Sequence, residues 1–78
     1  MADPFDQARK RLSRAVRIAR GRTGLSQEAL ALQAGINRSY VGQIERGVGN
    51  PSLRVLVKLA ETLGLDVAEL LAQVKPRR

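Results

Sequence analysis

The side chains of this chain suit hydrogen bonding and charge pairing rather than covalent catalysis. Its 78 residues include no cysteine and no histidine, which removes thiolate metal ligands, the commonest imidazole ligand and the commonest general base. The seven carboxylates are scattered, and the serines have no histidine or evident lysine partner. No glycine-rich phosphate loop follows a strand pattern. We therefore expect no enzyme activity, no metal, no cofactor and no small-molecule ligand.

Positive charge dominates the composition. Fourteen Lys and Arg residues face seven Asp and Glu residues, which gives a net charge of +7 and a pI near 11.4. Such an excess favours a polyanionic partner, with nucleic acid first and an anionic membrane surface second. Half of the basic residues lie between positions 9 and 22 and spread around a predicted helix: Arg9, Lys10, Arg11, Arg14, Arg17, Arg20 and Arg22. A solvated face is the default for most of them, and the lack of a single stripe disfavours a membrane-surface helix.

The apolar spacing predicts an all-α fold, since no window alternates as a strand does. We expect helices from near Asp3 or Asp6 to Arg22, from Ser26 to Gly35, from Asn37 to about Arg46, from Ser52 to Gly64, and from Asp66 to about Val74. The core-facing positions of the first and fourth helices are predicted as Phe5, Ala8, Leu12, Ala15, Val16, Ala19, Leu53, Leu56, Leu59, Ala60 and Leu63. A single domain over residues 1–78 accounts for the whole chain.

The segment from Gln27 to Gly47 has the spacing of two short helices joined by a tight turn. Gly35 can adopt the left-handed conformation that ends the first helix, and Asn37 can cap the second. The buried positions of this unit are predicted as Leu30, Ala31, Ala34, Ile36, Val41 and Ile44. Any helical hairpin could carry a lone glycine, but the joint agreement of these positions with the basic charge favours a DNA-binding helix-turn-helix.

The same segment resembles a known family. LSQEALALQAGINRSYVGQIERG followed by NPSL is similar to the Cro/CI-type, or XRE-type, helix-turn-helix family of lambda-repressor-like folds. The resemblance covers nearly the whole chain and implies a compact five-helix DNA-binding domain, with the helix-turn-helix at the second and third helices. Within the family, INRSYVGQIERG most resembles the controller proteins of restriction-modification genes. It implies a bacterial or phage-type cytoplasmic regulator associated with the nucleoid, for which RNA polymerase is a further candidate contact.

Three side chains of the third helix are the candidate base-contacting residues. Burial of Val41 and Ile44 leaves Arg38, Ser39 and Gln43 on the free face, together with Gly42. Arginine can bind guanine O6 and N7, and glutamine can bind adenine N6 and N7. The resemblance implies the same three base-contacting positions. A phosphate contact is the alternative for Arg38, and close approach to DNA or neutral drift are equal alternatives for the mid-helix Gly42.

Residues around this helix are candidates for phosphate contacts. Gln27 lies at a helix N-terminus, where free amides and the helix dipole attract phosphate. The resemblance implies this role for Gln27, Arg46 and Asn50, and it favours a phosphate contact over a core position for Tyr40. Arg54 is a further candidate, and Ser52 is better explained as a cap. Arg20 and Glu45 match a structural ion pair of the family, so their loss should destabilise the fold without changing the base preference.

Dimerisation is assigned to the region 53–74. The C-terminal segment offers more apolar surface than one short helix needs, at Leu65, Val67, Leu70, Leu71 and Val74. Ordinary core packing is the alternative, with Leu70 or Leu71 as its candidate. A core of this size is marginal, and oligomerisation would stabilise it. A homodimer on a pseudo-palindromic double-stranded operator follows. The alternative function is a helical protein-interaction module, such as an antitoxin whose basic surface binds an acidic protein.

Overall fold

The structure is a computed structural model that describes residues 3–72. It contains five helices, α1 (Pro4–Thr23), α2 (Gln27–Ala34), α3 (Arg38–Glu45), α4 (Leu53–Leu63) and α5 (Val67–Leu71). The predicted all-α class and the number and order of the helices are confirmed. The boundaries of the first four helices lie within one or two residues of the predicted positions.

Side-chain caps explain where the helices begin. The side chains of Asp3, Ser26, Asn37 and Ser52 each accept a backbone N–H from the first turn of the helix that follows. At α5, Asp66 and Glu69 form a reciprocal capping box, in which Glu69 accepts the Asp66 N–H at 2.9 Å. The turn between α2 and α3 passes through Gly35 at φ 72°, a backbone conformation that side chains with a Cβ rarely adopt. Local sequence therefore fixes the starts of the helices and the α2–α3 turn.

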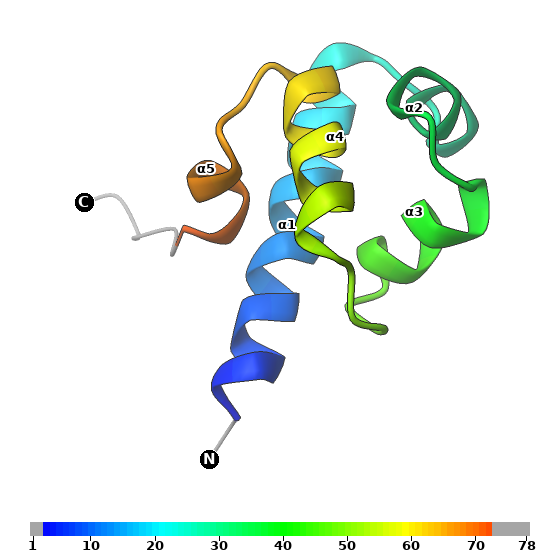
Figure 1. The fold of residues 1–78 in the computed structure, drawn as a ribbon. Helices are drawn as coiled ribbons and strands as arrows, with labels where there is room; N and C mark the ends of the chain where they lie inside the picture. Colours follow the sequence, from blue (N-terminus) through cyan, green and yellow to red (C-terminus); the bar gives the residue numbers. More distant parts are fainter. Residues whose placement is uncertain (1–2, 73–78) are drawn as a thin grey trace.

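The helices enclose one apolar core. Figure 1 shows α4 packed beside the long α1, with α2 and α3 on one side of this pair and α5 on the other. The core consists of Leu12, Val16, Ala19, Leu30, Ala31, Ala34, Val41, Ile44, Leu56, Leu59, Ala60, Leu63 and Leu70. Ile36 is half-buried against it. Five of the six buried positions predicted for the helix-turn-helix unit therefore lie in the core, and the sixth lies at its edge.

Three predictions about the core and the last helix were wrong. Phe5 is 43% exposed in the first turn of α1, which extends beyond the other helices in Figure 1, and the Arg9 guanidinium lies over its ring. Leu53 is 69% exposed at the first position of α4. The helix α5 ends at Leu71 rather than at Val74, and Val74 lies outside the described residues. Periodicity identifies the inward face of a helix, but it does not show how much of that face the other helices cover.

No helix among residues 3–72 is both long and apolar enough for a membrane span. Over the same residues, the acidic side chains form no group of three or more suited to metal binding.

Candidate nucleic-acid interface

The helix α3 is held by its apolar side and exposes its polar side. Val41 and Ile44 are buried in the core, where the small residues Ala31 and Ala34 of α2 allow close approach. Arg38, Ser39 and Gln43 are all exposed, as predicted for base-contacting residues. The structure therefore presents one polar helical surface that is available to a macromolecular partner.

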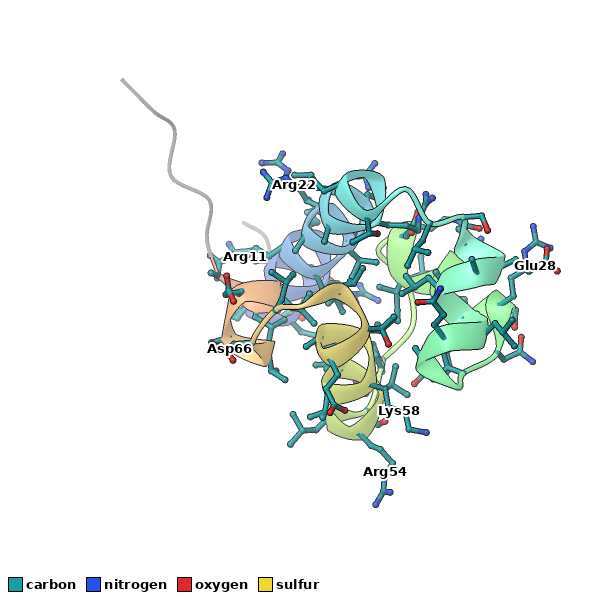
Figure 2. The ribbon with its side chains drawn as sticks, turned by 90° about the horizontal axis from the view of Figure 1, so that it is seen from above. Arg11, Arg22, Glu28, Arg54, Lys58 and Asp66 are labelled. Atoms are coloured by element: carbon teal, nitrogen blue, oxygen red, sulfur yellow. The ribbon has the colours of Figure 1, made fainter. Side chains whose placement is uncertain are left out.

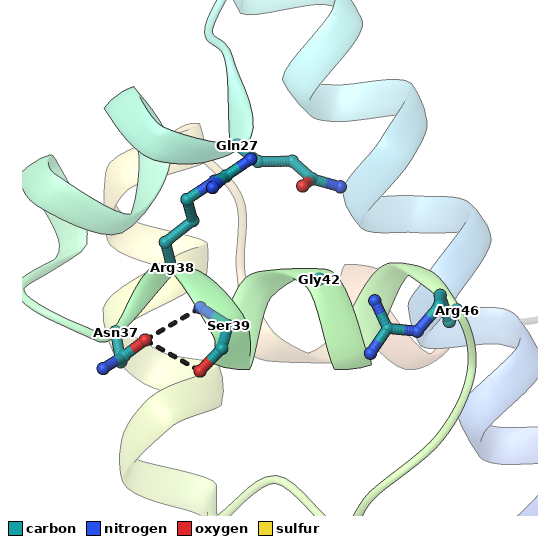
Figure 3. A pocket seen from close by; sticks show the side chains of 6 residues that line it. All are labelled: Gln27, Asn37, Arg38, Ser39, Gly42 and Arg46. Carbon is teal, nitrogen blue, oxygen red and sulfur yellow. Dashed lines mark hydrogen bonds between the residues drawn. The ribbon is translucent and has the colours of Figure 1, made fainter.

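An open hollow of about 430 Å³ lies between this surface and the start of α2. It is lined by Gln27, Asn37, Arg38, Ser39, Gly42 and Arg46. In Figure 3 the Arg38 side chain extends toward Gln27, and the Arg46 guanidinium points back along α3 toward Gly42. Two cations, two amides and a hydroxyl thus surround one solvent-filled space. Such a surface can donate hydrogen bonds to phosphate oxygens and base edges.

Ser39 is oriented by the capping residue of its own helix. The Asn37 side-chain oxygen accepts both the Ser39 backbone N–H and the Ser39 hydroxyl, each at 2.8 Å, as Figure 3 shows. With its proton donated to Asn37, the hydroxyl offers its lone pairs to the partner. Ser39 is therefore disposed to accept a hydrogen bond from a base amino group, such as that of adenine or cytosine.

Gly42 borders the hollow, on the face that the sequence suggested, but it is not free. It is buried, because the guanidinium of Arg46 lies against it, and a Cβ built on Gly42 would be 3.2 Å from an Arg46 terminal nitrogen. The side chain of Arg46 itself is exposed. The Arg46 guanidinium thus covers the part of α3 at Gly42, where the helix has no side chain.

The remaining candidate phosphate-contacting residues lie around the two ends of α3. Tyr40 is half-buried, and its hydroxyl accepts the Ser52 backbone N–H at 3.3 Å, an arrangement in which the hydroxyl proton can still be donated. Asn50 is exposed in the α3–α4 loop. Arg54 extends from the first turn of α4 into solvent, at the opposite edge of the molecule from Arg22 in Figure 2. The basic side chains thus project on several sides, and only some of them border α3.

The predicted ion pair between Arg20 and Glu45 is present. Arg20 donates from Nε to one Glu45 oxygen at 2.5 Å and from Nη2 to the other at 2.9 Å. A third nitrogen of Arg20 donates to the Leu25 carbonyl at 3.0 Å, and Gln27 donates its amide to Glu45 at 3.1 Å. The pair thus joins α1, α2 and α3, and it fixes the side chain of Gln27 at the start of α2.

The charge states of the pair follow from these contacts. Burial alone would raise the pKa of Glu45, but the hydrogen bonds from Arg20 and Gln27 and the charges of Arg20 and Arg17 outweigh it and lower that pKa. The hydrogen bond to Glu45 raises the pKa of Arg20. Both groups are therefore charged over the neutral range, and the position of α3 depends on a carboxylate.

Sequence reasoning missed two polar residues of α1 that hold α3 and the loop after it. The buried Ser13 hydroxyl donates to the Glu45 backbone carbonyl at 2.6 Å. Ser13 lies three residues before Val16, so helical spacing alone indicates its inward position. Arg9 pairs with Asp6, although a solvated face was the default expectation for it. Its Nη1 also donates to the Gly49 carbonyl at 3.5 Å. Both contacts cross more than thirty residues of sequence and only the fold reveals them.

The apolar residues assigned to a dimer interface divide into two groups. Leu70 is fully buried in the core of the chain, so it is a core residue, as the packing alternative allowed. Leu65, Val67 and Leu71 are only partly buried against the core and retain accessible surface. Val74 lies outside the described residues. Leu53 and Val57 of α4 add exposed apolar surface within the same region, 53–74.

A family model described as a helix-turn-helix matches residues 16–70, which include the whole of α2, α3 and α4 and the turns between them. The chain belongs to this helix-turn-helix family. The resemblance to the Cro/CI-type proteins is therefore confirmed, and the chain is a DNA-binding transcriptional regulator related to restriction-modification controller proteins rather than an enzyme.

Two curated relatives show how far the sequence similarity extends. The control protein C.SmaI of Serratia marcescens is 38% identical over 69 residues, which cover 88% of this chain and 82% of that protein. The regulator SlrR of Bacillus subtilis is 42% identical over 60 residues, which cover 76% of this chain. The chain spans only 40% of the length of SlrR.

Two solved structures share the fold. The hypothetical transcription factor NHTF from Neisseria superposes with a TM-score of 0.82 at 35% identity, over 92% of this chain and 83% of that one. The restriction-modification controller protein C.AhdI from Aeromonas hydrophila gives a TM-score of 0.75 at 43% identity, over 83% of this chain and 96% of that one. The five-helix architecture is thus that of controller-protein structures.

Proposed function

We propose that this helix-turn-helix regulator binds double-stranded DNA as a homodimer, on a pseudo-palindromic operator, and controls restriction-modification genes. The observation that carries the proposal is the exposed polar face of α3 beside the N-terminus of α2, in a chain related to C.SmaI and C.AhdI. The decisive experiment selects bound duplexes from a random pool. A symmetric site with two half-sites whose centres lie about 34 Å apart, one turn of DNA, supports the proposal.

Arg38, Ser39 and Gln43 are the proposed base-contacting residues. Arg38 lies at the start of α3, the part of a recognition helix that enters the major groove, and it would bind guanine O6 and N7. Gln43 would bind adenine. Arg38→Ala should reduce the preference for operator over random DNA by roughly 1 to 3 kcal/mol in competition titrations. Equal weakening on both duplexes would instead assign Arg38 to phosphate.

Gln27, Tyr40, Arg46, Asn50 and Arg54 are the proposed phosphate-contacting residues. Their donors flank the hollow, the α3–α4 loop and the start of α4. Loss of a phosphate contact should weaken binding to all sequences alike and reduce the slope of log affinity against log salt by about one. A flat salt response of the whole chain with duplex DNA would favour the alternative, a module that binds an acidic protein.

The proposed dimer uses the accessible apolar surface of the region 53–74. Leu65, Val67 and Leu71 contribute to it, and Leu53 of α4 offers a side chain that can be changed without disturbing the core. Leu53→Asp should dissociate the dimer in sedimentation equilibrium. Leu32→Asp is the matched control, since Leu32 is 82% exposed on α2, outside this region. The dimer proposal fails if the unmodified chain is monomeric, or if the two variants behave alike.

A bacterial or phage-type cytoplasmic location at the nucleoid, and a contact with RNA polymerase at regulated promoters, belong to the same proposal. Restriction-modification control is supported by the similarity to controller proteins. Reporter assays with the selected operator upstream of a promoter would distinguish repression from activation.

A further inference from the structure

Arg46 lies along the face of α3 that it shares with the residue four positions earlier. It follows the last residue of the helix, four residues after Gly42. A side chain that extended outward from there would reach the rim of a DNA groove and its phosphates. Instead, the guanidinium lies back along the helix over Gly42, beside the hollow that Arg38 and Ser39 also line, as Figure 3 shows. The cation is thus about one turn closer to the start of the recognition helix than its Cα is.

The absence of a side chain at position 42 leaves room for this arrangement. A Cβ at Gly42 would be 3.2 Å from an Arg46 terminal nitrogen, closer than ordinary van der Waals contact. Gly42 has an ordinary helical backbone, because the glycines with positive φ are at other positions. Its backbone conformation therefore does not require glycine, although glycine is less favourable than alanine inside a helix. We therefore assign the glycine at position 42 to its contact with Arg46 rather than to backbone conformation.

We propose that Arg46 contacts a base edge, with guanine as its target, and that Gly42 is the positioning residue that allows it. The proposal rests on the proposed DNA-binding function and changes one assignment within it, because Arg46 was expected to bind phosphate. Arginine offers the paired donors that match guanine O6 and N7 in the major groove. With Arg38 near the start of α3 and the guanidinium of Arg46 over its middle, two arginines would each contact a separate base pair of the half-site.

The first test replaces Arg46 by glutamine and compares base preferences by selection from a random duplex pool. Glutamine pairs with adenine rather than guanine, so Arg46→Gln should lower the preference for guanine at one position of each half-site by roughly 5- to 160-fold and favour adenine there. The matched control is Arg54→Gln, at an exposed arginine of α4. It should weaken binding to all sequences alike. If Arg46→Gln also weakens all sequences alike, Arg46 binds phosphate and the proposal is overturned.

The second test addresses Gly42 through graded variants. Gly42→Ala should move the Arg46 guanidinium by a few tenths of an ångström and Gly42→Leu should move it further, and both should alter preference at the same base position as Arg46→Gln. Folding should not suffer from Gly42→Ala, because the neighbour that must move is the end of a flexible side chain. Gly21→Ala is the matched control, since Gly21 lies inside α1 with no atom near the added Cβ. It should leave every base preference unchanged.

A double-variant cycle separates the positioning role from a direct clash with DNA. In the Arg46→Gln background, Gly42→Leu should have no further effect on base preference if Gly42 acts through Arg46. An effect that persists in that background would mean that position 42 contacts DNA directly, and it would overturn the positioning role. Absence of any sequence preference in the unmodified chain would instead refute the proposed function itself.

Discussion

Replacement of Glu45 by glutamine should reveal how much the ion pair contributes to the fold. Glu45 accepts three hydrogen bonds, two from Arg20 and one from Gln27. The amide of glutamine keeps one oxygen, which can still accept from Gln27 and one Arg20 nitrogen. Its NH₂ group, however, faces the remaining Arg20 donor. The variant therefore loses one charge-assisted hydrogen bond and places two donors against each other.

The expected loss follows from the size and the exposure of that bond. Hydrogen bonds to charged groups contribute about 1.5 to 3 kcal/mol. The Glu45 side chain is only 5% exposed, but that of Arg20 is 24% exposed, so water can replace part of the lost contact. We expect Glu45→Gln to lower the free energy of unfolding by about 2 kcal/mol, which corresponds to a melting temperature roughly 8 to 16 °C lower for a domain of this size.

The assay is urea denaturation at one fixed protein concentration, because dimerisation would make stability depend on concentration. Asp6→Asn provides a matched control, since Asp6 also pairs with an arginine, Arg9, but the Asp6 side chain is 44% exposed. That variant should lose at most about 1 kcal/mol, including its effect at the start of α1. If Glu45→Gln lowers the free energy of unfolding by no more than Asp6→Asn does, the Arg20–Glu45 pair contributes no more than a surface pair. That result would refute the reasoning. The base preference of folded Glu45→Gln should be unchanged.

Three further predictions follow from the same structure. Because folding lowers the pKa of Glu45, the ionised carboxylate should stabilise the fold fully above pH about 4.5, and this stabilisation should be lost as pH falls through the lower folded pKa. The free energy of unfolding, measured over the acid range, should therefore fall less steeply with pH in Glu45→Gln. Ser13→Ala should cost about 1 kcal/mol in urea denaturation, since it removes the hydroxyl donor to the Glu45 carbonyl; an unchanged midpoint would mean that water replaces the hydroxyl. Gly35→Ala should cost about 1 to 2 kcal/mol, because φ is 72° there, whereas Gly21→Ala inside α1 should stabilise by roughly 0.5 to 1 kcal/mol; equal shifts in melting temperature would contradict this backbone argument.

The sequence predicted most of the local structure because its signals are local. Capping residues such as Ser26 and Asn37 determine where helices begin, and Gly35 determines the turn between α2 and α3. The spacing of apolar residues identified the inward face of each helix, and with it the exposed positions of Arg38 and Gln43 on α3. Helical periodicity converts sequence position into direction, so these features needed no knowledge of distant contacts.

The tertiary structure decided which residues meet across the sequence and where packing stops. Periodicity placed Phe5 and Leu53 on inward faces, but both side chains are exposed in the first turn of their helices. The sequence left Leu70 between an interface and the core, and α5 turns it fully into the core. Such outcomes depend on helix lengths and loop paths, which a local pattern does not encode.

The same distinction holds within the candidate interface. The residue types on α3 and the basic charge determined from the sequence that this chain presents hydrogen-bond donors to a polyanion. Only the fold placed the Ser13 hydroxyl on the Glu45 carbonyl and tied Gln27 to the Arg20–Glu45 pair. Helix direction is set by nearby residues, whereas the path of a long side chain is set by whatever space its neighbours leave.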